Sequence, residues 1–250
     1  MFPEKYLELE GGKYKLSFYD DFSGNELDTT KWSLCPQQRR QDAGGWWDDS
    51  MIEVRDGKLV VKSDISKVTN MPISGGIRTR GKFEQAGGYF EIRCTLQKAH
   101  GHWGAFWLMC DEQCFANNGP MDGTAKDGAE FDIFESCHLD LKKICQNIHF
   151  DGYGVGHKQI PNVMLDTHVY DGNYHTFSLL WTKDAYIFFI DGKETYRLQE
   201  GDENYPGYCE PKTYLKISDE FGTWAGDYYP EELPDEWYVD YVRVYKLCEE

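Results

Sequence analysis

The sequence predicts an all-β fold in which two antiparallel sheets stack as a β-sandwich or jelly roll. Apolar and polar side chains alternate with a period of two along many short segments, most clearly from Gly88 to Gln97. Glycine-containing turns separate these segments, and long helical periodicity is missing. Because each such strand has one apolar face, two stacked sheets are needed to enclose the core.

The expected strands follow one another along the whole chain. Asp56-Gly57 and Asp191-Gly192 each join two strand-like runs, and Asp-Gly is a strong hairpin signal. A short helix or turn is expected at Leu139–Cys145 and a loop at Pro230–Glu236. The predicted strands are Lys13–Phe22, Lys58–Ser63, Ile77–Phe83, Gly88–Gln97, Trp103–Met109, Tyr174–Trp181, Tyr186–Ile190, Tyr214–Ser218 and Trp237–Lys246.

Length and charge narrow the classes of protein to consider. The 250 residues carry no repeat or linker, and we expect one domain, 1–250, because all-β sandwiches commonly reach about 200–250 residues. A net charge of −17 without any basic run argues against nucleic acid and anionic membranes as partners. No segment approaches the ~20 apolar residues of a spanning helix, and no signal peptide is present in this sequence.

The cysteine and aromatic residues indicate how the chain packs and what kind of ligand it binds. The eight cysteines lack the spacing of a zinc finger or ribbon, so we expect mostly buried free thiols with a bridge or two at most. Aromatic residues make up 16% of the chain, more than two stacked sheets bury easily, which suggests a carbohydrate cleft where rings stack on sugars. Four tryptophans are assigned to the core, namely Trp32, Trp107, Trp181 and Trp237.

Three carboxylates stand close together in one apolar segment, Gly128–Ser136. The apolar residues between them identify a strand, in which Glu130 and Asp132 share a face because side chains alternate. Glu135 has the opposite parity. A β-bulge that absorbs one of the two residues after Asp132 returns Glu135 to the carboxylate side, and bulges are frequent beside active sites.

Carboxylates on one face repel one another unless they share protons or bind a cation. Sharing splits their pKa values, so that one is protonated near neutral pH while another is ionised. Glycoside hydrolysis needs that pairing. A calcium site is the alternative chemistry, whereas a solvated charged face fits poorly with the apolar neighbours. Parity and charge favour catalysis over metal binding and leave both open.

At this segment the chain resembles glycoside hydrolase family 16. Residues 130–135, E-F-D-I-F-E, are similar to the family's E-x-D-x-x-E signature in its bulged, laminarinase-like form. Residues 101–109, G-H-W-G-A-F-W-L-M, resemble its G-x-W-P-A-F-W-L-L strand. Similar segments continue in the family's order from Asp20-Asp21-Phe22 to residues 237–245, W-Y-V-D-Y-V-R-V-Y, so the resemblance runs through nearly the whole chain.

The resemblance implies a concanavalin-like sandwich with an open substrate cleft and hydrolysis with retention of configuration. Glu130 would be the nucleophile, Glu135 the general acid/base and Asp132 the helper between them. A retaining pair is expected to lie roughly 5–5.5 Å apart. Two positions depart from the family pattern, Gly104 in place of Pro and Phe131 in place of Ile or Leu. Neither is a carboxylate, so the chemistry is unaffected.

Five residues are candidates for substrate binding. By resemblance, Trp103 stacks on a sugar near the cleavage point, His149 faces the cleft beside the carboxylates, and Trp224 is a loop tryptophan before the last strand. Arg78 shares strand parity with a second arginine, and a solvated strand face explains it about as well as contact with sugar hydroxyls or acidic groups. Trp47 lies in an exposed-looking aromatic loop that would form a subsite wall.

No cofactor is expected for catalysis, but the resemblance implies a structural calcium ion. Its ligands would be Asp20, the carbonyl near Gly57, and Asp240, since oxygen ligands suit calcium. Chelation should then lower the melting temperature. His100 and His102 are two possible ligands without a third, so we do not assign them to a metal.

The leading functional interpretation is an endo-acting retaining β-glycanase. Its substrate would be a polysaccharide, with β-1,3-glucan or mixed β-1,3-1,4-glucan first. An endohydrolase of galactans (agarose, carrageenan, porphyran or mucin-type β-galactosides) is the alternative, and a non-catalytic carbohydrate-binding module is a distant third. A polymer too large to enter a cell implies an extracellular or periplasmic enzyme, which we expect to be a monomer.

Overall fold

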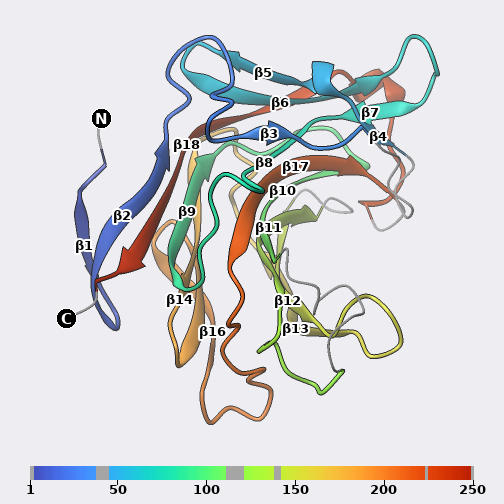
Figure 1. Cartoon of the computed structure of the whole chain (residues 1–250). Helices are drawn as coiled ribbons and strands as arrows, with labels where there is room; N and C mark the ends of the chain where they lie inside the picture. The colour runs from blue at the N-terminus through green and yellow to red at the C-terminus, as the bar shows by residue number, and fades with distance from the viewer. Residues whose placement is uncertain (1–2, 38–44, 111–120, 138–141, 223–224, 249–250) are drawn as a thin grey trace.

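The computed structural model describes residues 3–37, 45–110, 121–137, 142–222 and 225–248, and it confirms the predicted all-β fold (Figure 1). Two sheets, antiparallel except for the parallel pair of β4 and β7, pack face to face. The strands are β1 (Tyr6–Leu9), β2 (Gly12–Asp20), β3 (Ser33–Leu34), β4 (Trp46–Trp47), β5 (Ile52–Arg55), β6 (Lys58–Ile65), β7 (Pro72–Ser74), β8 (Gly76–Arg78), β9 (Gly88–Cys94), β10 (His102–Cys110), β11 (Glu130–Cys137), β12 (Lys143–Phe150), β13 (Lys158–Asp166), β14 (His175–Trp181), β15 (Ala185–Ile190), β16 (Lys193–Gln199), β17 (Thr213–Phe221) and β18 (Asp235–Leu247). Two short 3-10 helices are η1 (Asp49–Met51) and η4 (Pro230–Glu232).

The two sheets differ in size and in what they carry. The seven-stranded sheet has the order β13-β12-β11-β10-β17-β8-β3 and contains the carboxylate strand, β11. The eleven-stranded sheet runs β16-β15-β14-β9-β18-β6-β7-β4, with β1, β2 and β5 attached beside this path. Long-range pairing between β9 and β18 joins the middle of the chain to its end. In the other sheet the carboxylate strand, β11, is held between β10 and β12.

Both Asp-Gly hairpins are confirmed. Asp56 and Gly57 have φ angles of 55° and 68°, and Asp191 and Gly192 have 50° and 72°. Two successive positive φ angles match the right-handed twist of the flanking strands, which is why Asp-Gly favours this turn. The predicted strand Ile77–Phe83 is wrong in its extent, because β8 ends at Arg78 and a turn begins at Thr79, whose carbonyl accepts hydrogen bonds from the next turn.

The main core lies between the sheets and absorbs most of the aromatic residues. Trp32, Trp181 and Trp237 are fully buried in it, as predicted. Phe131 and Phe134 of β11 pack against Trp181 and Trp237 from the opposite sheet. The six cysteines for which the structure gives a state are free thiols, five of them buried, in agreement with the expectation.

A buried polar cluster joins the two sheets. His102 of β10 is fully buried, and its Nδ1 lies 2.9 Å from the carboxylate of Asp219 on β17. Its Nε2 lies 3.2 Å from Asp235 on β18. Asp219 also accepts hydrogen bonds from Ser63 and Trp237 of the eleven-stranded sheet. Burial lowers the pKa of His102, but the two carboxylates outweigh it and raise the pKa to about 9.

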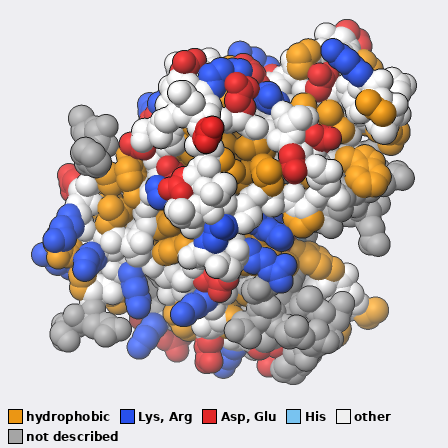
Figure 2. Space-filling view, turned by 45° about the horizontal axis from the view of Figure 1, so that its top comes forward, with side chains coloured by type: hydrophobic (Ala, Val, Ile, Leu, Met, Phe, Trp, Pro, Cys, Tyr) orange, Lys and Arg blue, Asp and Glu red, His pale blue; other side chains and the backbone are white. Residues whose placement is uncertain are grey.

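The surface mixes charges of both signs. On the face shown in Figure 2, acidic and basic side chains are interspersed with exposed hydrophobic ones, so the net charge of −17 forms no single acidic field there. Within the described part of the chain, no helix has the length and apolar character needed to cross a membrane.

Candidate active site

The predicted bulge is present in β11 and brings the three carboxylates to one face of the seven-stranded sheet, here named the carboxylate face. Pairing with β12 shifts register between Asp132 and Glu135. On the other side, Asp132 pairs with Trp107 and Glu135 with Ala105. Ile133 is the residue absorbed by the bulge, yet its side chain remains in the main core. Glu130, Asp132 and Glu135 therefore all point away from that core.

Burial makes Glu130 an unusually weak acid. Glu130 is 8% exposed and Asp132 is 3% exposed, while Glu135 is half-buried. Desolvation, followed by the neighbouring charge of Asp132, raises the pKa of Glu130 to about 7. Lys216, on β17, opposes this rise through its positive charge. Near neutral pH the cluster therefore holds a group poised between its two protonation states.

The connection after β12 supplies a hydrogen bond to Glu130 that the sequence did not reveal. The hydroxyl of Tyr153 donates to the Glu130 carboxylate and lowers the pKa of that group. A phenol hydrogen bond of this kind stabilises the ionised carboxylate. Tyrosine is frequent in this chain and Tyr153 lies in a loop, so no spacing marked it as part of the site.

His149 contacts the cluster from β12, as predicted. Its Nε2 lies 3.0 Å from Asp132, and its Nδ1 lies 2.8 Å from Nε2 of His157. Burial lowers the pKa of His149, but the hydrogen bond to Asp132 and the nearby carboxylates outweigh it and raise the pKa. Burial and the charge of His149 lower the pKa of His157. The geometry allows Nε2 of His149 to donate to Asp132 and Nδ1 of His149 to donate to Nε2 of His157.

Glu130, Asp132 and His149 also form a group with the geometry of a metal site, since their ligand atoms lie within 4.8 Å of one another. The chemistry of these donors fits an ion poorly. A histidine binds metal through a deprotonated ring nitrogen, and here the raised pKa of His149 favours the imidazolium form. Tyr153 already occupies one oxygen of Glu130. The donors are arranged to exchange protons.

Aromatic side chains lie beside the carboxylates on β10. Trp103 and Trp107 are each 7% exposed and form a separate cluster with Ala105 and Ala225. The expectation that Trp107 belongs to the core with the other three tryptophans is therefore only half right, because Trp107 is buried on the carboxylate face. Strand parity with Trp103 indicated this position. Trp224 lies outside the described residues.

Trp47 and Arg78 also reach this face, but not as expected. Trp47 is 3% exposed and donates from Nε1 to the carbonyl of Asp219, whereas its neighbour Trp46 is 42% exposed. The exposed wall is thus not formed by Trp47. In the strand register, Arg78 lies opposite Lys216, Lys216 lies opposite Trp107, and Trp107 lies opposite Asp132. These four residues therefore form one row across the sheet.

The departure at Gly104 has a local cause. Its backbone N–H donates to Oγ of Ser136 at 2.7 Å, a hydrogen bond that proline lacks the proton to make. A Cβ at this position would also lie 2.9 Å from the ring of Trp237. Glycine therefore fits this close contact between the sheets.

The residues proposed for calcium do not fit that ion. Asp240 forms ion pairs with Lys58 and Arg93, which place two positive charges where the calcium would bind. Asp20 accepts hydrogen bonds from Nε1 of Trp32 at 2.8 Å and from a backbone amide. Gly57 serves as the second residue of its hairpin turn. These contacts give the calcium expectation no support at this set of residues, and it stays a prediction.

The melting temperature should consequently be insensitive to calcium. An ion stabilises a protein only if it binds the folded state preferentially, so replacing millimolar CaCl₂ by EDTA should shift Tm by less than about 1 °C. Differential scanning fluorimetry at constant ionic strength measures this. A reproducible drop of several degrees with EDTA, reversed by calcium and not by magnesium, would restore a calcium site.

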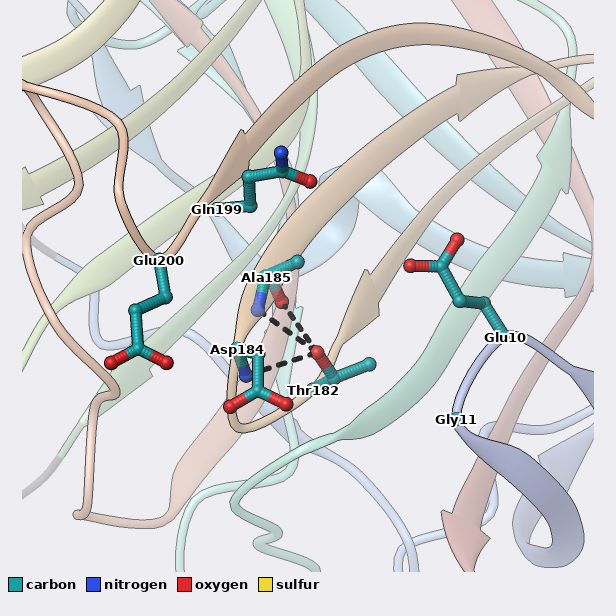
Figure 3. Close-up of a pocket in the computed structure, with 7 residues that line it drawn as sticks. All are labelled: Glu10, Gly11, Thr182, Asp184, Ala185, Gln199 and Glu200. Carbon is teal, nitrogen blue, oxygen red and sulfur yellow. Dashed lines mark hydrogen bonds between the residues drawn. The ribbon is translucent and has the colours of Figure 1, made fainter.

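A pocket of about 380 Å³ lies far from these residues in the sheet order, at the turn between β14 and β15 (Figure 3). Glu10, Asp184 and Glu200 line it, and the hydroxyl of Thr182 accepts hydrogen bonds from the amides of Asp184 and Ala185. Glu10 is also paired with Arg197. Hydrogen bonds within the turn account for this arrangement, and none of the carboxylates of β11 contributes to it.

Known proteins match the chain along most of its length. The sequence profile of the glycosyl hydrolases family 16 matches residues 40–243. The glucan endo-1,3-beta-glucosidase A1 of Niallia circulans is 26% identical over 267 residues, which cover 92% of this chain and 38% of that protein. The keratan-sulfate endo-1,4-beta-galactosidase of Sphingobacterium multivorum is 25% identical over 247 residues, covering 94% of this chain and 56% of that protein. The chain thus spans about half or less of these two relatives.

The fold agrees with this match. The crystal structure of a non-specific endo-beta-1,3(4)-glucanase from family GH16 superposes with a TM-score of 0.78 at 25% identity, covering 93% of this chain and 91% of that one. The profile match, the shared sandwich and the bulged carboxylate strand lead to the same conclusion. The chain belongs to glycosyl hydrolases family 16.

Proposed function

We propose that the protein is an endo-acting hydrolase that cleaves a β-linked polysaccharide with retention of configuration. The observation that carries this proposal is the bulge in β11, which turns Glu130, Asp132 and Glu135 to one face. Double displacement requires Glu130 to be ionised and Glu135 to be protonated at the start, and interacting carboxyl groups share protons unequally in this way. The pKa of Glu130 is raised to about 7, so this carboxyl group is mostly ionised only above neutral pH.

In the first step the ionised carboxylate of Glu130 attacks the anomeric carbon and forms a covalent ester. The glycosidic C–O bond breaks, and the protonated Glu135 gives its proton to the leaving oxygen. In the second step Glu135 takes a proton from water, the hydroxide oxygen bonds to the anomeric carbon, and Glu130 leaves as a carboxylate. Asp132, held by His149 at 3.0 Å, keeps its position beside Glu130 throughout.

The substrate that we propose first is β-1,3-glucan or mixed β-1,3-1,4-glucan. The names of the glucan endo-1,3-beta-glucosidase and of the endo-beta-1,3(4)-glucanase support this backbone. A galactan is the second candidate, supported by the keratan-sulfate galactosidase and by the basic side chains of Lys216 and Arg78. Because such polymers do not enter cells, we further propose that the enzyme is extracellular or periplasmic. We also propose that it acts as a monomer.

A panel of polysaccharides tests the proposal. We expect new reducing ends and a ladder of oligosaccharides from laminarin or barley β-glucan, with agarose, κ-carrageenan and keratan sulfate as the galactan arm. Proton NMR during hydrolysis should show the β-anomer first, as retention requires. No cleavage of any polymer while an enzyme known for each polymer cleaves it in parallel, or initial release of the α-anomer, would refute it.

A further inference from the structure

Two basic residues face each other on neighbouring strands of the carboxylate face. Lys216 on β17 pairs directly with Arg78 on β8, and β10 separates Lys216 from the carboxylate strand. At a strand spacing of about 4.8 Å, their backbones lie roughly 10 and 14 Å from that of Asp132. Like charges directly opposite each other on a sheet are destabilising, so this pair concentrates positive charge on the carboxylate face at a cost in stability.

Aromatic rings and burial hold the Lys216 ammonium group in a fixed place. Its Nζ lies 3.6 Å from the ring centre of Trp107 and 4.6 Å from that of Trp47. The residue is only 6% exposed. Cation–π contacts of this kind position a cation at low entropic cost. A charge held in such surroundings is weakly screened by water and acts strongly on any nearby anion.

Arg78 differs from most other arginines of the described chain. Its Nε is buried and has no hydrogen-bond partner among the described residues. The protein is rich in carboxylates, and ion pairs hold other arginines: Arg55 with Glu236, Arg93 with Asp240, Arg197 with Glu10, and Arg243 with Glu91. A buried donor without an acceptor costs free energy. Because Nε is shielded from solvent, a ligand would bind Arg78 through the outer nitrogens of the guanidinium group.

We propose that Lys216 and Arg78 form a subsite for an anionic substituent of the glycan, a sulfate ester or a carboxylate. The proposal rests on the proposed hydrolase function and specifies its substrate class. Both anions present oxygen acceptors to the planar guanidinium and to the ammonium group. The separation from Asp132 places the charged group on a part of the glycan away from the bond that is cleaved.

The test compares neutral and anionic forms of one backbone. The best-cleaved polymer of the panel is used unmodified, sulfated, and carboxymethylated at a similar low degree of substitution, and kcat/KM is measured for each. The wild-type enzyme should prefer an anionic form over the neutral one. Lys216→Met and Arg78→Gln should each reduce that preference about 10- to 100-fold, the loss expected for one charge-assisted hydrogen bond.

The ratio between two substrates isolates the subsite. Any effect of the lost charge on Glu130 changes both rates equally and cancels in the ratio. Lys246→Met, an exposed lysine on β18 of the other sheet, removes the same charge and should leave both rates unchanged. Sulfate and carboxylate arms identify which anion is bound. A wild-type enzyme that cleaves the neutral form equally well or better, with no change in the ratio for either variant, refutes the subsite but leaves the hydrolase function intact. Failure to cleave any form refutes the function itself.

Discussion

Glu130→Gln should abolish hydrolysis, with kcat reduced by at least about 10⁴-fold, because an amide cannot form the covalent intermediate. Glu135→Gln should reduce kcat by roughly 10²- to 10⁴-fold, the usual contribution of general acid–base catalysis. Both substitutions keep the size of the side chain. Reducing-end assays on the best substrate of the panel, with Tm as the test of folding, measure the effect. Full activity of either variant would overturn the assignment of roles.

The pH dependence of the wild-type enzyme gives an independent measure of the same site. Burial and Asp132 raise the pKa of Glu130 to about 7, and only the ionised form attacks the sugar. As the pH falls through 7, Glu130 becomes protonated, so kcat/KM should fall toward tenfold per pH unit. Glu231→Gln, at an exposed position in η4, is the matched control and should change neither the rate nor the profile.

His102→Gln should lower the free energy of unfolding by about 3–5 kcal/mol, which corresponds to a loss of roughly 6–20 °C in Tm for a chain of this size. The variant leaves the buried carboxylates of Asp219 and Asp235 without the positive charge that lies between them. Chemical denaturation followed by tryptophan fluorescence measures the change. His100→Gln is the control, because His100 forms an exposed pair with Glu232 that is worth less than about 1 kcal/mol.

The same residue should make wild-type stability depend on pH. The pKa of His102 is about 9 in the folded protein and near 6.5 when the chain is unfolded. The stabilisation is therefore complete below pH 6.5 and is lost as the pH rises toward 9. This measurement needs only the wild-type protein, so it applies even if the variant does not fold. Equal stability of wild-type protein at pH 6.5 and 9, together with a harmless His102→Gln, would contradict the role of the cluster.

Local signals in the sequence were sufficient for the architecture. Alternation identified β9, β10, β14 and β18, and Asp-Gly pairs located two hairpins, because backbone geometry dictates these patterns residue by residue. The extent of β8 was harder to predict. Thr79 continues the alternation of Ile77 and Arg78, but its carbonyl and hydroxyl form turn hydrogen bonds that apolar periodicity does not report.

Site residues could be predicted from the sequence only where strand alternation or the resemblance to the family identified them. The odd spacing of Glu135 required a bulge, and the structure contains it. Tyr153 and His157 were missed because a loop brings them to the carboxylates, and loop geometry has no periodicity to read. The importance of Lys216 depends on its neighbours across the sheet. The ion pairs of Asp240 with Lys58 and Arg93, which argue against calcium at that carboxylate, could not be read from the sequence because the three residues lie far apart along the chain.

The bulge also separates two demands that usually compete within one strand. In a regular strand, successive side chains point to opposite faces. One additional core residue would therefore turn the next carboxylate toward the core. Here Ile133 and Phe134 are consecutive and both lie in the main core, yet Glu135 lies on the same face of the sheet as Asp132. Loss of one of these two apolar residues would remove the bulge and leave a regular strand with Glu130, Asp132 and the third carboxylate still on one face. The fold can therefore exchange one core side chain at this point for a regular strand and keep the same carboxylate face.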